Sequence, residues 1–267
     1  MSILVISLAG IGDTLFATPL IHELRANFPT ATIDAFVLWP GSKNLLEGNP
    51  HLNSIHQKNL ISASKVESLR FMWQLRQKRY DISINTHPQS RVHYRAVARL
   101  INARVRVSHE YDNAAGWDRL LVNRILKQDY SKHAVENNLA LLETVGAKRM
   151  LPRHEYEVFP SPADLKWAED FIAQHHWTGR KRLGIHLGSG GTKNLPLRRW
   201  PVDYYLELLK QLRQNPELSR LVVIMVTTET ELDQMAAALE AGANEYVMKP
   251  FTKEILVEKL QLVGIHP

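Results

Sequence analysis

The 267-residue sequence contains no cysteine, which excludes disulfide bridges, cysteine-based zinc sites and thiol nucleophiles. It also lacks a long hydrophobic run: the longest purely apolar stretch, 221–226, is far shorter than the ~18 residues of a membrane-spanning helix. The apolar first twenty residues have no basic start, and Asp13 falls where a signal peptide would be hydrophobic. We therefore expect a cytoplasmic protein without a transmembrane segment, either free or peripheral to the inner membrane.

Dense blocks of positive charge are missing as well. The chain has 33 Lys and Arg residues against 27 Asp and Glu residues, a net charge of +6, with no run of five to eight basic residues. We interpret this surplus as modest and spread along the sequence. It fits anionic ligands such as nucleotides, phosphates or lipid head groups, but it does not predict nucleic-acid binding. The 45% apolar content excludes disorder over most of the chain.

Apolar strands alternate with helical patterns in both halves of the sequence. The first half opens with a strand at 3–8, a helix that ends at 28–29 and a second strand at 32–38. This order is typical of a doubly wound parallel sheet. In the second half we expect strands at 183–187, 221–226 and 245–248, alternating with helices at 202–214, 231–241 and 253–263. The fold class is therefore α/β, with two Rossmann-like domains of which the second is small.

A proline-rich stretch marks the crossing between these halves. Pro152, Pro160 and Pro162 lie close together, and a helix is expected after them at 163–175. We accordingly divide the chain into an N-terminal domain at 1–150, an interdomain linker and helix at 151–180, and a C-terminal domain at 181–267.

The first chemical motif is the glycine pair that follows the first strand. Gly10 and Gly12 let the backbone approach a ligand, and the next helix offers free N–H groups at its start. Asp13 at this helix start is stabilised in its charged form, so it can cap the helix or accept a proton from a substrate hydroxyl. Thr18-Pro19 marks either the true start of the helix or a bend in it.

Residues 3–37 resemble the opening of the bacterial heptosyltransferases, glycosyltransferase family 9. The segments 80–88, 133–139 and 184–201 are similar to the family's mid-domain strand, interdomain helix and donor-side loop, so that the resemblance covers about residues 1–215. It implies a GT-B-like fold with the active site between two domains. The N-terminal domain would hold the acceptor, and the C-terminal domain a nucleotide sugar, usually ADP-heptose.

The same resemblance implies an inverting transfer, without metal or cofactor, to a lipopolysaccharide core-type acceptor at the membrane surface. Asp13 matches the family's general base, and Gly12 and His87 lie on the acceptor side. Arg198 stands where the family usually has a lysine. The donor diphosphate would be bound by Gly188, Ser189, Gly190, Lys193 and Arg198.

Local structural roles compete with these assignments. His87 at a strand end and His133 at a helix start both fit hydrogen bonds to nearby backbone. Arg198 also fits a solvated position at a helix entry. Packing inside the protein, rather than stacking on a sugar, is expected of Trp39, Trp73, Trp117 and Trp167. No His, Asp or Glu cluster shows metal-ligand spacing, so no metal site is predicted.

The end of the chain carries a second pattern. Residues 221–264 resemble the C-terminal half of a response-regulator receiver domain of the chemotaxis type, with Thr227 and Lys249 matching its switch hydroxyl and phosphate-binding lysine. In a whole receiver these two groups hold a phosphorylated aspartate. No strand expected in 181–220 ends in Asp, so phosphorylation of the usual kind is not expected. Thr227 and Lys249 are then either an oxyanion site or relics.

The chain thus resembles a chimera, natural or engineered, joined near 216–221. Nothing in 215–267 matches the heptosyltransferase segment of Asp-x-Gly-x-x-His type, which puts the adenosine side of the donor site in question. Three functions stay open. The chain could be a glycosyltransferase impaired by its replaced C-terminal half, a non-catalytic chimera that only folds, or a signalling module that uses the receiver-like helices.

Overall fold

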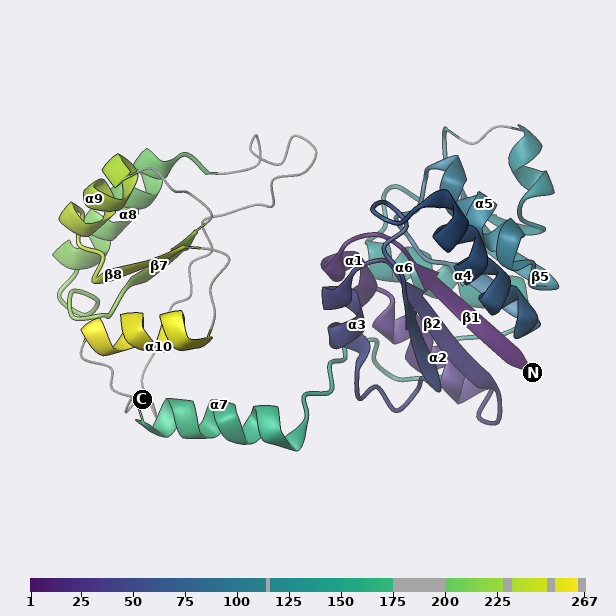
Figure 1. Ribbon diagram of the computed structural model, residues 1–267, viewed down its shortest axis with the longest axis horizontal. Coiled ribbons are helices and arrows are strands. Elements are labelled where there is room, and N and C mark those ends of the chain that lie inside the picture. Colours follow the sequence, from purple (N-terminus) through teal and green to yellow (C-terminus); the bar gives the residue numbers. More distant parts are fainter. Residues whose placement is uncertain (114–115, 175–199, 228–231, 249–252, 264–267) are drawn as a thin grey trace. The chain divides into compact units, whose positions relative to one another are not determined.

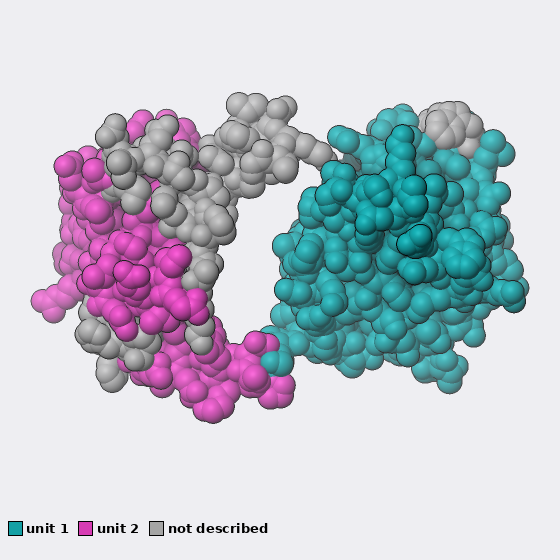
Figure 2. Space-filling view, viewed as in Figure 1, with its two compact units in different colours: residues 1–161 teal, residues 162–267 magenta. Residues whose placement is uncertain are grey.

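The computed structural model describes residues 1–113, 116–174, 200–227, 232–248 and 253–263. The chain forms two compact units, Met1–Ser161 and Pro162–Pro267 (Figures 1 and 2). The division between them falls inside the segment 151–180 that the sequence indicates as a linker. None of the helices in the described part of the chain is long and apolar enough to cross a membrane.

Unit 1 is built on a six-stranded parallel sheet with the strand order β3-β2-β1-β4-β5-β6. The order reverses between β1 and β4, which are neighbours in register from Ile3 opposite Ile82 to Ile6 opposite Asn85. In such sheets a crevice opens at the carboxyl ends of the two strands where the order reverses. The strands are β1 (Ser2–Ser7), β2 (Thr32–Val37), β3 (Ser54–Gln57), β4 (Ile82–Asn85), β5 (Val105–Glu110) and β6 (Arg124–Lys127).

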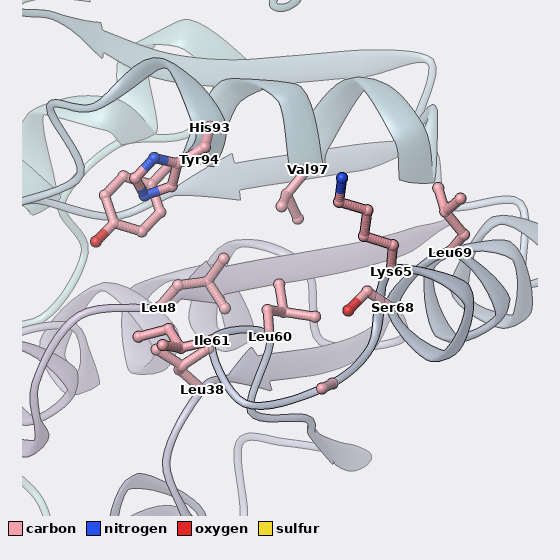
Figure 3. Close-up of a pocket in the computed structure, with 11 residues that line it drawn as sticks. Leu8, Leu38, Leu60, Ile61, Lys65, Ser68, Leu69, His93, Tyr94 and Val97 are labelled. Carbon is pink, nitrogen blue, oxygen red and sulfur yellow. The ribbon is translucent and has the colours of Figure 1, made fainter.

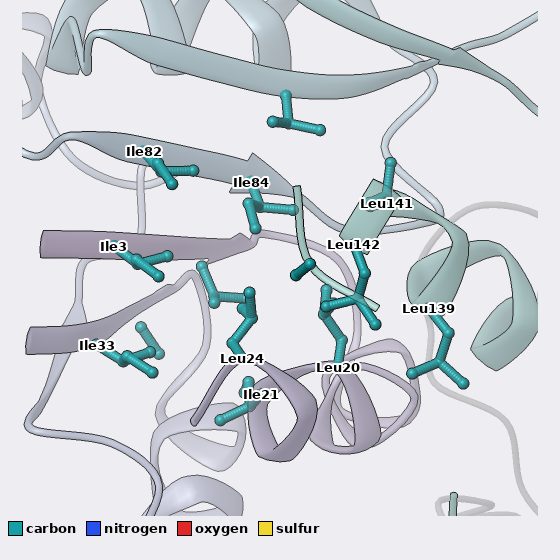
Figure 4. Close-up of a cluster of buried hydrophobic side chains, with 14 of the residues drawn as sticks. Ile3, Leu20, Ile21, Leu24, Ile33, Ile82, Ile84, Leu139, Leu141 and Leu142 are labelled. Atoms are coloured by element: carbon teal, nitrogen blue, oxygen red, sulfur yellow. The ribbon is translucent and has the colours of Figure 1, made fainter. Parts of the chain in front are cut away.

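Helices cover both faces of this sheet, as doubly wound folds require. The helices are α1 (Ile11–Leu15), α2 (Thr18–Asn27), α3 (Pro40–Leu46), α4 (Lys65–Gln77), α5 (Val92–Ile101) and α6 (Ala134–Ala140), with 3-10 turns η1 (Gly116–Leu120) and η2 (Leu141–Val145). Alternate residues of β1 point to opposite faces. Ile3 and Val5 pack against α2, α6 and η2 (Figure 4), whereas Leu4 and Ile6 pack against α4 and α5.

The helix expected after the glycine pair is two helices. α1 ends at Leu15 and α2 begins at Thr18, with Pro19 in its first turn where a missing N–H costs nothing. The segment that follows His133 is also divided, into α6 and η2, and η2 ends at Gly146, whose φ of 73° is left-handed.

Unit 2 contains a parallel pair of strands, β7 (Ile224–Thr227) and β8 (Glu245–Met248). The described residues of this unit also form the helices α7 (Pro162–Gln174), α8 (Val202–Gln214), α9 (Leu232–Glu240) and α10 (Lys253–Leu262). Leu209 and Leu212 of α8 pack with Met225, Ala238 and Tyr246 in a core of its own. The strand expected at 183–187 and the glycine-rich loop after it lie outside the described residues.

Candidate functional site

Asp13 lies at the carboxyl end of β1, on the first turn of α1, at the point where the strand order reverses. Its Oδ2 atom accepts a hydrogen bond of 2.8 Å from the backbone N–H of Gly10. The capping role that the residues allowed is therefore present in the structure. The hydrogen bond also fixes the orientation of the Asp13 carboxylate.

The loop that carries Asp13 is held by buried hydroxyl groups. Thr14 Oγ1 lies 3.2 Å from Ser7 Oγ, donates to Ser42 Oγ at 3.1 Å and lies 3.1 Å from the carbonyl oxygen of Gly10. These contacts join the end of β1, the start of α1 and α3. Gly12 faces open space, since no heavy atom lies within 4 Å of the place where a Cβ would stand.

His87 follows the neighbouring strand β4 and lies before a cis peptide bond to Pro88. Its backbone N–H donates to Asn138 Oδ1 at 2.7 Å, while Asn138 Nδ2 donates to the carbonyl oxygen of Phe16 at 3.1 Å. Asn138 therefore ties the loop of His87 to the end of α1. The His87 ring stacks on Tyr111, with 5.9 Å between ring centroids and 3.5 Å between Nδ1 and the hydroxyl oxygen.

The charge of Asp13 acts on the side chains around it. Burial lowers the pKa of His87, and this effect outweighs the opposing influence of the Asp13 carboxylate and of Gln128. Burial raises the pKa of Tyr94, to which Asp13 also contributes. Behind His87, burial and the His87 ring lower the pKa of His109 to about 4. Both imidazoles are consequently neutral at pH 7.

An apolar pocket of about 490 Å³ lies on the α4–α5 side of the sheet (Figure 3). Tyr94 belongs both to this pocket and to the surroundings of Asp13, so the pocket adjoins the candidate site. Pockets of this size and character are common places for small ligands. It is lined by Leu8, Leu38, Leu60, Ile61, Ala63, Lys65, Ser68, Leu69, His93, Tyr94 and Val97.

Among the described residues, His22, His51 and Glu157 could each offer one ligand atom to a metal ion. The two rings are stacked, with 3.8 Å between centroids and 15° between planes, and His22 Nδ1 lies 2.7 Å from Glu157 Oε1. A metal ion binds an imidazole nitrogen in the plane of the ring, and two stacked parallel rings cannot both meet this condition at one ion. As arranged, these residues fasten the segment around Glu157 to α2.

All of the predicted donor-side residues fall outside the part of the chain that the structure describes. Gly188, Ser189, Gly190, Lys193 and Arg198 lie outside the described residues, and so does Lys249 of the receiver-like pair. Thr227 is the last residue of β7, opposite Met248 of β8, and its side chain is not among those described. The structure therefore brings together Asp13, Gly12 and His87 but leaves the donor residues as predictions.

His133 has the local role that its position at a helix start indicates. Its Nδ1 atom accepts the N–H of Val135 at 3.3 Å, and its ring contacts Phe16 edge-on. Sequence reasoning missed Asn138, Tyr94 and Tyr111. Asn138 stood inside the segment 133–139 that resembles the family's interdomain helix, so a signal for it existed. No sequence signal pointed to Tyr94 and Tyr111, because the packing of α5 and the end of β5 bring them to the site.

Comparison with known proteins finds heptosyltransferases for the N-terminal part. The chain is 30% identical over 146 residues to lipopolysaccharide heptosyltransferase 3 of Escherichia coli, which is 52% of this chain and 42% of that protein. Among solved structures, the glycosyl transferase family 9 protein of Veillonella parvula has a TM-score of 0.70 at 17% identity, covering 98% of this chain and 72% of that one.

Two Escherichia coli structures agree with this. ADP-heptose lps heptosyltransferase II has a TM-score of 0.65 at 20% identity, covering 96% of this chain and 75% of that one. The heptosyltransferase WaaC with ADP-2-deoxy-2-fluoro heptose has a TM-score of 0.62 at 17% identity, covering 97% and 80%. The expected GT-B-type fold is thereby confirmed.

The C-terminal part matches a different family. The model of the response regulator receiver domain matches residues 206–261. Chemotaxis protein CheY1 of Helicobacter pylori is 41% identical over 58 residues, which is 22% of this chain and 47% of that protein. The chain thus joins a heptosyltransferase-like part to a receiver segment, as the sequence indicated, and spans less than half the length of each curated relative. The receiver match begins inside α8, earlier than the junction predicted near 216–221.

Proposed function

We propose that this chain transfers a heptose from ADP-heptose to a hydroxyl group of a lipopolysaccharide core-type acceptor, with inversion and without a metal ion. The observation that carries the proposal is the position of Asp13, a charged carboxylate at the crevice where the strand order reverses, beside the neutral His87. The similarity to heptosyltransferase 3 and the family 9 fold support it.

In the proposed reaction Asp13 acts as the general base. The acceptor oxygen forms a bond to the anomeric carbon while its proton passes to the Asp13 carboxylate. The bond between that carbon and the diphosphate oxygen breaks, and ADP leaves with the electron pair. The hydrogen bond from Gly10 holds the carboxylate in place before the acceptor arrives, so that little reorganisation is needed during proton transfer.

His87 and Gly12 would position the acceptor. A neutral imidazole can donate to or accept from a sugar hydroxyl, and the lowered pKa of His87 keeps it in that form near pH 7. The open space at Gly12 allows a sugar ring to approach the backbone at the start of α1. The apolar pocket beside Tyr94 gives the acceptor an apolar wall on the α4–α5 side.

The donor diphosphate is assigned from the resemblance to Gly188, Ser189, Gly190, Lys193 and Arg198. Backbone N–H groups of a glycine-rich loop bind phosphate oxygens, and cationic side chains stabilise the charge that develops on the leaving diphosphate. These groups would do together what a metal ion does in other transferases, which is the reason for proposing a metal-independent reaction.

Transfer from ADP-heptose to a deacylated core oligosaccharide, followed by ADP release, tests the proposal. Asp13→Asn is expected to lower the rate by roughly 10²- to 10⁴-fold because the base is lost. The same variant should keep its ADP-heptose affinity in calorimetry. The exposed Asp112, changed to Asn, is the matched control and should keep full activity. EDTA should leave the wild-type rate unchanged.

Two outcomes would contradict the proposal. An Asp13→Asn variant with the wild-type rate would remove Asp13 from the reaction. A wild-type chain that binds no ADP or ADP-heptose, and shows no rise in Tm with either, would favour the alternative of a non-catalytic chimera.

The receiver match favours one further candidate, a signalling module in which the helices of unit 2 bind a partner. A phosphate-dependent switch would need a phosphoryl group near Thr227 and Lys249. A beryllofluoride titration tests this: a saturable change in tryptophan fluorescence would support a switch, and no change would exclude it.

A further inference from the structure

The outward side of α4 is apolar where a surface helix is normally polar. Val66, Leu69 and Trp73 are 69%, 55% and 59% exposed, and their spacing of three and four residues places them on one side of the helix. Met72 and Leu75, on the opposite side, are buried in the core. The expectation that Trp73 packs inside the protein is therefore wrong. Large apolar side chains gathered on one exposed helix face indicate a binding surface.

Basic residues border this apolar stripe. Lys65 and Arg76 lie on one side of it and Arg70 on the other, and no carboxylate in the described part of the chain forms an ion pair with any of the three. Glu67, the one acidic residue of α4, caps the helix: its Oε2 accepts from the backbone N–H of Ser64 at 2.9 Å. We call Lys65, Val66, Leu69, Arg70, Trp73 and Arg76 the α4 face.

The surroundings of the α4 face are strongly basic. Residues 58–106 contain eleven Lys and Arg residues and two acidic ones, a net charge of +9 in a chain whose total is +6. The positive charge is thus concentrated in residues 58–106. Our interpretation of the composition, that the charge is spread along the sequence, is wrong. Arg95 is buried against Asp118, and most of the other basic side chains are exposed.

The apolar surface extends beyond the helix. Ile61, in the turn before α4, is 74% exposed, and both Ile61 and Leu69 also line the pocket of Figure 3. On the other side Leu100 of α5 is 43% exposed, and its carbonyl oxygen accepts a hydrogen bond from Arg76 Nη1. The exposed apolar residues therefore continue from the mouth of the pocket, across α4, to the end of α5.

We propose that the α4 face docks this protein on a lipid bilayer that contains anionic head groups. A helix with Trp, Leu and Val on one side and Lys or Arg at its borders is typical of helices that lie in the membrane interface. Long basic side chains reach the head-group phosphates while their stems cover apolar surface. Aliphatic Val66 and Leu69 offer nothing to a nucleic acid, and protein interfaces contain few lysines at their core. The surface is separate from Asp13, so the proposal does not depend on transfer activity.

Cosedimentation of the full chain with vesicles tests this. We expect binding to phosphatidylethanolamine vesicles that contain phosphatidylglycerol, little binding to phosphatidylcholine vesicles, and loss of binding at high salt. Arg70→Gln with Arg76→Gln should weaken the partition coefficient roughly 25-fold, since each basic residue contributes about fivefold. Val66→Ser with Trp73→Gln should weaken it at least roughly tenfold, because apolar burial is lost.

Matched variants elsewhere on the chain serve as controls. Arg119→Gln with Arg124→Gln removes two exposed charges, and Leu165→Ser with Trp167→Gln removes two exposed apolar side chains of α7. Both should bind vesicles like the wild type, and circular dichroism should show that every variant folds. Absence of wild-type binding to anionic vesicles would overturn the proposal, as would equal losses in controls and α4 variants. Self-association in ultracentrifugation that Val66→Ser with Trp73→Gln abolishes would assign the face to a second copy instead.

Discussion

The hydroxyl group of Tyr80 donates a hydrogen bond of 2.5 Å to Asp34 Oδ2 in the interior of unit 1. The same oxygen accepts from Lys78 Nζ and lies against His56 Nε2, each at 3.1 Å. Burial raises the pKa of Asp34, but these three partners outweigh it and bring the pKa down to about 2. Asp34 lies on β2 and Tyr80 just before β4, two strands that are not neighbours in the sheet. This carboxylate therefore joins segments that the strand ladder does not.

Asp34→Asn is expected to lower the free energy of unfolding at pH 7 by roughly 2 kcal/mol. This is the free energy that corresponds to a pKa of about 2 in the folded state instead of 3.8. Because the pKa is lowered in the folded state, this stability is present above about pH 4 and is lost as the pH falls towards 2. Urea unfolding at several pH values measures it. Below about pH 4 the free energy of unfolding should fall less steeply with pH in Asp34→Asn than in the wild type, whereas an Asp112→Asn control should behave like the wild type. Equal slopes for Asp34→Asn and the wild type would contradict the prediction.

Glu23 fastens the segment after Lys148 to α2. The backbone N–H groups of Met150 and Leu151 donate to it at 3.0 Å, and His154 Nε2 lies 2.8 Å from Oε1. Burial raises its pKa, but these partners outweigh burial and lower the pKa overall. Glu23→Gln replaces one of the two acceptor oxygens with an NH2 donor that faces N–H groups, and should destabilise the unit by roughly 2 to 3 kcal/mol.

The same substitution should expose the segment 148–159 to protease, which limited proteolysis with mass spectrometry would detect. His154→Gln removes one partner only and should have the smaller effect. The loss on Glu23→Gln should shrink as the pH falls from the ordinary glutamate pKa through the lowered pKa of the folded state, where the wild-type carboxylate becomes protonated. A Glu23→Gln variant with wild-type stability and cleavage pattern would contradict the role of this residue.

Three glycines form a graded test of backbone strain. At Gly48, where φ is +76°, an added Cβ would stand 2.8 Å from the carbonyl oxygen of Phe159, whereas at Gly146, with φ of +73°, it would meet nothing. Gly116 has neither constraint. Thermal unfolding should find Gly116→Ala near neutral, Gly146→Ala destabilised by about 1 kcal/mol and Gly48→Ala by more than that. A Gly48→Ala variant no worse than Gly146→Ala would show that the contact with Phe159 yields easily.

Arg213 holds unit 2 together from the end of α8. Its guanidinium donates to the carbonyl oxygens of Ser219, Leu221 and Gly242 and to Asn244 Oδ1, at distances of 2.6 to 3.0 Å. Arg213→Lys keeps the charge but not the planar set of donors. We expect a loss of roughly 2 kcal/mol, seen as faster hydrogen exchange in β7 and β8. The exposed Arg220, changed to Lys, should leave exchange unchanged.

Much of the fold could be predicted because its elements are strongly periodic. α8 at 202–214 and β8 at 245–248 have the predicted bounds, and β1 and β2 differ from theirs by one residue. The elements missed were α3, β3 and β6. α3 begins Pro40-Gly41-Ser42, residues typical of turns, and the two strands are four residues long with little apolar character, so neither pattern stood out.

The candidate site was predictable only where a motif lay next to a strand. Asp13 and His87 follow β1 and β4 directly, so sheet topology brings their ends together. Tyr94 and Tyr111 reach the site through the packing of α5 and the end of β5, which no local pattern records. The exposed stripe of α4 was missed because its helical spacing is equally typical of a buried face, and only the structure shows that Met72 and Leu75 point inward instead.

The bonds that Arg213 makes all end on residues within 206–261, the stretch that matches the receiver family. Among the residues that the structure describes, Arg213 thus braces the receiver segment from within. A piece with this property can be cut from one protein and spliced to another without losing the contacts that shape it. Whether a supersecondary block can be exchanged between unrelated α/β proteins then depends on whether its stabilising hydrogen bonds lie within the block, rather than on overall sequence similarity.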